Sequence, residues 1–215
     1  MDRIRFADGT EWDVATVKTL VLQATAVNDT LHGYATAGTL SGLAGDDTLY
    51  GGDGDDLLNG GAADDTLVGG NGGDDLVGGA GNDTLRGGAG NDIFRYARGD
   101  GADSLYDYDL TVGNADMLRF GADIAADQLW FRRVHSDLEV SVIGTADKTT
   151  ITNWYSGSAY HVEQFVTAEG KVLLDTQVDN LISAMASFNP PAAGQSTLPQ
   201  NYRDALAGVI AANWK

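Results

Sequence analysis

Residues 69–95 read GGNGGDDLVGGAGNDTLRGGAGNDIFR, which is one nine-residue unit written three times. Each unit has the form G-G-x-G-x-D-x-L-x, with Phe94 in the leucine place of the third copy. A flexible acidic linker could share this composition but would not keep a fixed period. The period therefore predicts a repeat architecture in which similar units stack on one another. Apolar residues nine apart extend it toward the N-terminus, through Leu31, Leu40, Leu49, Leu58, Leu67, Leu76, Leu85 and Phe94.

We expect each unit to divide into a six-residue turn and a three-residue strand whose middle, apolar side chain points inward. Glycine allows the turn to adopt positive φ and to direct its carbonyl groups inward. Two units would make one coil, so units on the same side of the coil are every second unit of the chain. This arrangement places the repeat aspartates in two rows, one with Asp29, Asp47, Asp65 and Asp83 and the other with Asp56, Asp74 and Asp92.

These rows predict calcium binding, because calcium prefers six to eight carboxylate and carbonyl oxygens. The segment 24–109 carries 16 aspartates, no glutamate and only three arginines. One buried leucine in nine residues offers too little apolar burial to offset the loss of conformational entropy and this charge repulsion. We therefore expect the segment to be disordered unless a cation binds to it.

The repeat units resemble the calcium-binding nonapeptide repeats of the repeats-in-toxin (RTX) family. That resemblance implies an all-β fold, a parallel β-roll, and export by type I secretion. It also implies that two loops share each calcium ion: the earlier loop gives its second and fourth carbonyls, the later loop its first and third, and each gives its aspartate. Four sites follow, with about four to six ions expected in all. The sites are Leu43, Gly45 and Asp47 with Gly60, Ala62 and Asp65; Gly52, Gly54 and Asp56 with Gly69, Asn71 and Asp74; Gly61, Ala63 and Asp65 with Gly78, Ala80 and Asp83; and Gly70, Gly72 and Asp74 with Gly87, Ala89 and Asp92.

The first two units depart from the family pattern. The unit 33–41 has Gly38 in the aspartate place, which argues against a site that pairs it with Asp56. The unit that begins at residue 24 keeps Asp29 but lacks its glycines. We therefore expect its pairing with Asp47 to be weak.

Two later departures also bear on the sites. Ala63 replaces a fourth-position glycine, which matters only if that residue needs positive φ. After Phe94 the period breaks. A longer loop that contains Asp100 and Asp103 is expected to close a last site with Asp83.

Residues 110–175 predict a β-rich cap, because glycine pairs give way to alternating strands. Its motifs resemble the module that follows the calcium repeats of many RTX proteins. Residues 176–215 hold two helical patterns, and their ending resembles the C-termini of RTX proteins, which implies an uncleaved type I secretion signal. The cap motifs are Asp116, Leu118 and Phe120; Asn153, Trp154 and Tyr155; and Glu163, Gln164 and Phe165.

Residues 1–23 predict the end of a preceding β module, followed by a capping helix over 14–22. Residues 2–9 align with residues 163–170 at a constant offset of 161. From this alignment we expect the chain to be part of a longer, tandemly built protein. A chance similarity between two hairpins is the alternative.

The whole chain has a net charge of -18 and a pI near 4.1. An acidic protein of this kind is a poor partner for nucleic acid or for anionic membranes. The sequence holds no cysteine, no apolar run long enough for a spanning helix, and no catalytic motif of the nucleophile-elbow, phosphate-loop or zinc-protease type. We therefore expect no enzyme in this chain.

The expected function is a calcium-binding roll that folds on meeting extracellular calcium and supports type I secretion and folding of a larger secreted protein. Its expected partners are calcium and the type I secretion machinery. Two alternatives remain open. One is an adhesive or glycan-binding module that contacts polysaccharide or a cell surface through Trp130 or Trp154. The other is the non-catalytic tail of a secreted hydrolase or protease.

Overall fold

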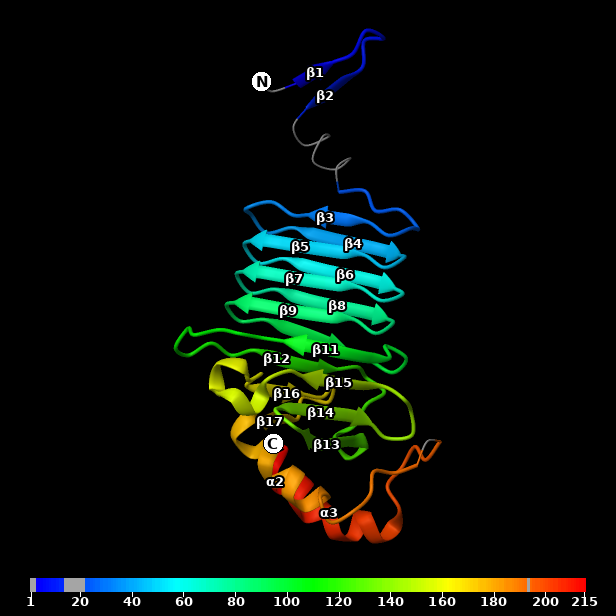
Figure 1. The fold of residues 1–215 in the computed structure, drawn as a ribbon, viewed down its shortest axis with the longest axis vertical. Helices are drawn as coiled ribbons and strands as arrows, with labels where there is room; N and C mark the ends of the chain where they lie inside the picture. Colours follow the sequence, from blue (N-terminus) through cyan, green and yellow to red (C-terminus); the bar gives the residue numbers. More distant parts are fainter. Residues whose placement is uncertain (1–2, 14–21, 193) are drawn as a thin grey trace.

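This computed structural model describes residues 3–13, 22–192 and 194–215. Its most regular part is a stack of short strands, which we call the roll (residues 30–106, Figure 1). The strands of the roll are β3 (Thr30–His32), β4 (Thr39–Ala44), β5 (Thr48–Asp53), β6 (Leu57–Ala62), β7 (Thr66–Asn71), β8 (Asp75–Ala80), β9 (Thr84–Ala89), β10 (Ile93–Tyr96) and β11 (Ala102–Tyr106).

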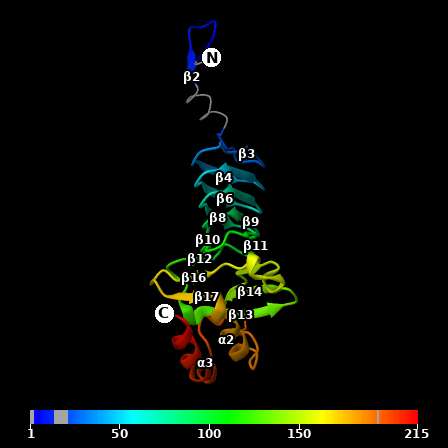
Figure 2. The same cartoon turned by 90° about the vertical axis from the view of Figure 1, so that its left-hand side faces the viewer.

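The chain passes from one sheet of the roll to the other at every unit. Even-numbered strands lie in a sheet of order β10-β8-β6-β4, and odd-numbered strands lie in a sheet of order β11-β9-β7-β5-β3. Neighbouring strands are parallel and two units apart in the chain, as in the pairing of Leu49 with Leu67. The predicted parallel β-roll is therefore confirmed. Figure 2 shows the two sheets as a narrow stack that widens toward the C-terminal part.

The strands of the roll are longer than the three residues that the sequence predicted. From β4 to β9 each strand has six residues and includes the first three positions of the next unit. Gly52, for example, pairs with Gly70 within the β5–β7 ladder. The predicted six-residue turn was wrong because the paired glycines continue the ladder and leave only a short bend between strands.

The leucine series forms one apolar column between the two sheets. Leu49, Leu58, Leu67 and Leu76 are fully buried. The column continues beyond the repeats through residues that the period does not include, namely Leu105, Leu118 and Phe165. The interior of the roll and that of the following module are therefore continuous.

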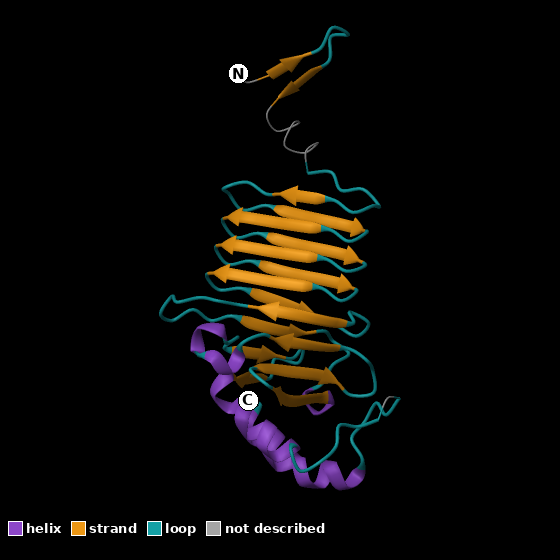
Figure 3. Ribbon diagram, viewed as in Figure 1, coloured by secondary structure: helices purple, strands orange, loops and turns teal. Residues whose placement is uncertain are grey.

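That module, which we call the cap (residues 107–192 and 194–215), extends both sheets. Strand β12 pairs with β10 and β15 pairs with β11 in parallel, and antiparallel strands then close each sheet. Two helices pack at the end of the cap (Figure 3). The elements are β12 (Met117–Phe120), β13 (Leu129–Val134), β14 (Asp137–Val142), β15 (Lys148–Ile151), β16 (Gln164–Val166), β17 (Val172–Leu174), α2 (Asp175–Met185) and α3 (Gln200–Asn213).

The N-terminal strands β1 (Arg3–Arg5) and β2 (Glu11–Asp13) form an antiparallel hairpin. Its register matches that of β16 and β17 at an offset of 161, since Arg3 pairs with Asp13 as Gln164 pairs with Leu174. The turns also match, with Gly9 at φ 88° and Gly170 at φ 84°. The two segments that align in sequence therefore have the same hairpin conformation. The helix predicted over 14–22 lies outside the described residues except for its last position.

Candidate calcium sites

The repeat aspartates lie in the bends of the roll and contact the bends of neighbouring coils. From Asp47 onward, each uses Oδ1 to accept a hydrogen bond from the backbone N–H of the residue two units earlier in the chain, which is an aspartate except for Asp56, where it is Gly38. The acid that precedes Asp47, Asp56 and Asp65 in each unit, such as Asp46 before Asp47, is exposed. The donor and acceptor pairs are Asp47 and Asp65 (2.7 Å), Asp65 and Asp83 (2.8 Å), Asp56 and Asp74 (2.8 Å), and Asp74 and Asp92 (2.8 Å).

The second oxygen of every repeat aspartate except Asp29 is buried and has no hydrogen-bond partner. This holds for Oδ2 of Asp47, Asp56, Asp65, Asp74, Asp83 and Asp92. Among the residues that the structure describes, no lysine or arginine forms an ion pair with these carboxylates. A buried, unpaired carboxylate oxygen is costly. The row therefore has the electrostatic requirements of a cation site.

A backbone carbonyl lies beside the free Oδ2 at each of the four predicted sites. A Cβ added at Gly51 would lie 2.7 Å from Oδ2 of Asp56 and 2.6 Å from the carbonyl oxygen of Gly69. The two oxygens thus converge on the space that glycine leaves open. The same convergence occurs at Gly42, with Asp47 and Gly60; at Gly60, with Asp65 and Gly78; and at Gly69, with Asp74 and Gly87.

These donors suit calcium rather than a metal held by side chains alone. Within the described ranges, no three acidic, histidine or cysteine side chains form a group that could hold a metal ion. A site in the roll must therefore combine carboxylates with carbonyls, and hard oxygen donors of both kinds are what calcium takes.

Burial, together with neighbouring carboxylates, raises the pKa of Asp65 and Asp74 to about 6 and that of Asp92 to about 7. An aspartate in the unfolded chain has a pKa near 4. Because these pKa values are higher, the folded, metal-free roll keeps protons bound at pH values where the unfolded chain has released them. Its stability is therefore greatest below about pH 4 and falls as the pH rises through about 6 to 7. At neutral pH the ionised row needs a compensating cation.

Comparison with known families identifies these loops. Residues 32–67 and 68–105 match the RTX calcium-binding nonapeptide repeat, and residues 137–177 match the haemolysin-type calcium binding protein related domain. The chain is an RTX calcium-binding repeat protein. Its repeats are a calcium-binding module, and neither matched family is a catalytic one.

Relatives of this RTX protein cover only part of its length. The iron-regulated protein FrpA of Neisseria meningitidis serogroup C is 37% identical over 90 residues, which are 40% of this chain and 8% of FrpA. The AlgE6R3 subunit of the Azotobacter vinelandii mannuronan C5-epimerase is similar over 60% of this chain and 72% of that one, at 24% identity and a TM-score of 0.36. The extracellular lipase LipA from Serratia marcescens is similar over 59% of this chain and 36% of its own, at 16% identity and a TM-score of 0.30.

Two RTX bends contain a non-glycine residue with positive φ. Ala63 has φ 84°, so the fourth position does require the left-handed region there, and Leu43 has φ 78° at a second position. Each side chain adds strain of about 1–2 kcal/mol. Both residues were predicted as carbonyl donors, a role that does not depend on the side chain.

The weak units at the start of the RTX array differ from the others in their contacts. The backbone N–H of Asp29 donates to Oδ1 of Asp47, but Oδ2 of Asp29 accepts from the N–H and the hydroxyl of Thr25. That oxygen is therefore not free for an ion. At Gly38 the backbone N–H donates to Asp56 (2.7 Å), but the glycine brings no carboxylate of its own.

The loop after Phe94 lies beside Asp83, where the sequence predicted a last site. Oδ1 of Asp103 accepts from the backbone N–H of Asp83 (3.0 Å), and Oδ2 of Asp100 accepts from Ala97 (2.6 Å). Burial, together with the nearby Asp83, Asp100 and Asp147, raises the pKa of Asp103 to about 8. The sequence did not predict Asp147, which lies far from Asp103 along the chain, just before β15.

Sequence reasoning also missed four acids at the junction with the cap. Asp107, Asp109 and Asp116 are buried, and Glu163 accepts from the backbone N–H of Asp116 (2.8 Å). Burial, together with its contact with Asp116, raises the pKa of Asp107 to about 9. The available signal was that Asp116 directly precedes a strand, as a repeat aspartate does. Its spacing from Asp92 does not fit the repeat period, however, and this concealed the relationship.

Gly51→Ala tests the geometry of one RTX site. The added methyl group would lie 2.6–2.7 Å from the two oxygens that converge there. Since Gly51 does not have positive φ, filling this space is the main effect. We expect the calcium-loaded protein to lose about 1–3 kcal/mol of stability, measured by urea unfolding at saturating calcium. The control is Gly208→Ala in α3, where no atom lies within 4 Å of the new Cβ. Equal stability of the two variants would contradict the site.

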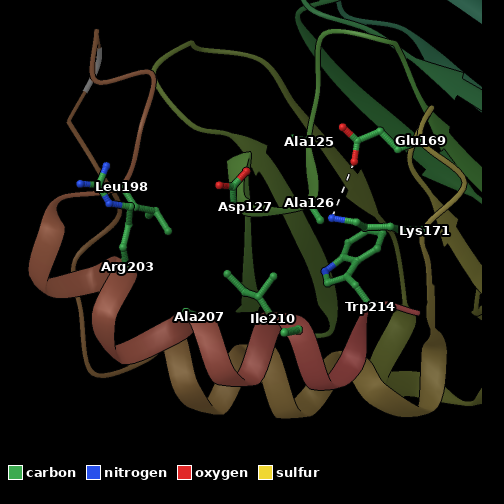
Figure 4. A pocket seen from close by; sticks show the side chains of 11 residues that line it. Ala125, Ala126, Asp127, Glu169, Lys171, Leu198, Arg203, Ala207, Ile210 and Trp214 are labelled. Atoms are coloured by element: carbon green, nitrogen blue, oxygen red, sulfur yellow. Dashed lines mark ion pairs between the residues drawn. The ribbon is translucent and has the colours of Figure 1, made fainter.

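A separate cavity of about 640 Å³ lies in the cap, away from the RTX loops, between the short 3-10 turn before β13 (Ala126–Gln128), the β16–β17 turn and α3 (Figure 4). Glu169 and Lys171 form an ion pair across its rim (3.7 Å). The buried indole N–H of Trp214 has no hydrogen-bond partner. The cavity holds none of the repeat aspartates, so the roll remains the candidate site.

Proposed function

We propose that this chain is a calcium-gated folding module, in which calcium bound between stacked bends holds the roll together. The observation that carries the proposal is the row of buried Oδ2 atoms that have no hydrogen-bond partner among the described residues. Calcium would neutralise the row and link each coil to the next coil of the same sheet. It would thus supply stability that one leucine per unit does not.

The ligands we propose are those of the four loop pairs given above. The convergence of an aspartate oxygen with a later carbonyl at each of the four glycines supports them. We add a fifth site that involves Asp83, Asp100 and Asp103, and we assign no complete site to Asp29. The loop pairs share aspartates, since Asp65 and Asp74 each belong to two pairs. Binding at one pair therefore orders half of the next.

Calcium sites of extracellular modules have dissociation constants of about 0.1–1 mM. A roll with such sites stays unfolded in a calcium-poor cytosol, passes a type I exporter as an extended chain, and folds outside. None of the described helices is long and apolar enough to cross a bilayer. In this proposal the calcium-binding segment covers residues 24–109, the β-rich module 110–175 and the secretion signal 176–215. Residues 1–23 end a preceding module, and any catalysis belongs to other parts of a longer secreted protein.

The glycan-binding alternative receives little support from the cap. Trp130 and Trp154 are each only 3% exposed. Trp154 stacks on His161, and Phe131 and Phe165 are in ring contact beside it. These tryptophans belong to the core of the cap and offer no open platform for a sugar. The alternative of a hydrolase or protease tail is compatible with the proposal and differs only in the parent protein.

Export and protease resistance test the proposal together. The chain is expressed in a host with a type I exporter, in media with about 5 mM calcium, well above the expected dissociation constants, or with chelator. We expect a protease-sensitive chain inside the cells in both media, and a resistant chain outside only with calcium. Replacing 200–215 by an unrelated polar sequence is expected to stop export.

A chain that resists protease inside the cell would contradict calcium gating. Unchanged export after replacement of residues 200–215 would instead contradict the proposal that the type I secretion signal lies at the C-terminal end. The two parts of the proposal can therefore fail separately.

A further inference from the structure

The last bend of the even-numbered sheet is closed by a segment that is not a repeat. Strand β12 pairs with β10 in the register of the repeats, with Met117 opposite Ile93. Asp116 takes the place of the next repeat aspartate, and its Oδ1 accepts from the backbone N–H of Asp92 (2.8 Å). The separation in the chain is larger than two repeat units, so the connection contains a longer closing loop (residues 107–116).

Two carboxylates of the closing loop accept hydrogen bonds from backbone N–H groups of the last bend. In the earlier coils, backbone carbonyls take this role. In an ordinary coil, the N–H of Gly72 donates to the carbonyl of Ala89 (2.7 Å). At the end of the roll, the equivalent N–H of Gly90 donates to Oδ2 of Asp109 (3.0 Å). The N–H of Gly88 donates to Oδ1 of Asp107 (3.3 Å). The last bend thus receives charged oxygens in place of neutral ones.

Asp107 is 1% exposed, and its Oδ2 has no hydrogen-bond partner. The Oδ2 of Asp92 is also buried and unpartnered. Asp116 is fully buried, and its Oδ2 accepts from the side-chain amide of Asn114 (2.9 Å). No lysine or arginine in the described part of the chain forms an ion pair with any of these three acids.

We propose that a further calcium site lies between the roll and the cap, with Oδ2 of Asp92 and Oδ2 of Asp107 as carboxylate ligands. Backbone carbonyls of the bend 88–91 complete its oxygen shell, and Asp109 and Asp116 hold the closing loop against that bend. The inference rests on the proposed calcium binding of the roll and extends it to residues outside the repeats. An ion here fastens the cap to the roll, because Asp92 belongs to the roll and Asp107 to the cap. The backbone N–H of Asp116 in turn donates to Glu163 (2.8 Å), which ties the closing loop to the rest of the cap.

Asp107→Asn tests this site, because asparagine keeps the shape and the acceptor for Gly88 but replaces the free oxygen by an amide. Bound calcium is counted by equilibrium dialysis, with folding followed by near-UV circular dichroism of the cap tryptophans. We expect one ion fewer per chain than in the wild type. The control Asp127→Asn removes an exposed acid of the cap and is expected to bind the wild-type number.

A full count of ions in Asp107→Asn would overturn this site while leaving the proposed function intact. A wild-type chain that binds no calcium would overturn both. Crystals of the wild type grown with calcium give a measurement that does not depend on folding of the variant. Anomalous density is expected between Asp92 and Asp107, and density in the repeat loops without density there would overturn the site.

Discussion

A sample stripped of calcium is expected to lose the entire roll at neutral pH. Sixteen aspartates and three arginines lie between residues 24 and 109, and seven of these aspartates, six in the repeats and Asp107 after them, bury an unpartnered oxygen when the coils stack. Without a cation these oxygens remain unpaired and repel one another, and the leucine column is too thin to compensate. The metal-free segment should therefore behave as a disordered acidic chain.

Far-UV circular dichroism measures this effect directly. With chelator we expect a spectrum dominated by disorder, and addition of calcium to about 1–5 mM should restore β-structure in a cooperative transition. Magnesium at the same concentration is the control, because its small radius and strict octahedral geometry do not suit wide, carbonyl-lined bends. A chelated sample that keeps its β-spectrum and its melting temperature would contradict calcium as the stabilising element.

Asp65→Ala and Asp74→Ala are the substitutions with the largest expected effects. Each side chain is almost completely buried between two neighbouring bends and belongs to two of the proposed loop pairs. Loss of one partner from a buried charged arrangement costs about 3–5 kcal/mol. We expect this loss in urea unfolding at saturating calcium, together with a lower number of bound ions.

Two control substitutions distinguish the loss of a proposed calcium ligand from the loss of an acidic side chain elsewhere in the repeats. Asp64→Ala changes the exposed neighbour of Asp65, whose carboxylate accepts from the backbone of Asn82 (2.8 Å). It should cost about 1 kcal/mol, the value of one hydrogen bond. Asp29→Ala should cost similarly little because its Oδ2 is occupied by Thr25. Losses as large as that of Asp65→Ala in either control would show that the loops are paired differently.

The sequence predicted most of the roll because its contacts repeat with its period. If residue 49 pairs with residue 67, the same offset of 18 residues gives the register of every later pair of coils in the repeats. The offset also places the repeat aspartates in their two rows. The strand lengths could not be read in the same way. Paired glycines are typical of turns, whereas here the first two glycines of a unit extend the ladder because neighbouring coils pair with them.

The ends of the roll were harder to predict, because residues that are neighbours in space there are not separated by a fixed number of residues in the sequence. Asp103 was found from its place in the loop after Phe94, but Asp107 and Asp116 follow Asp92 at distances that match no period. Asp147 and Glu163 reach the roll only through the pairing of β15 and β16 with earlier strands. Such contacts depend on tertiary structure, for which a single sequence gives no spacing rule.

The alternation of the chain between two sheets limits how such an array can change in evolution. Insertion or deletion of two units together adds or removes one coil and leaves every remaining neighbour in place. Insertion or deletion of a single unit would transfer all later strands to the opposite sheet, including β12 and β15, which join the cap to one sheet each. Genes for arrays of this kind should therefore lengthen or shorten by pairs of units.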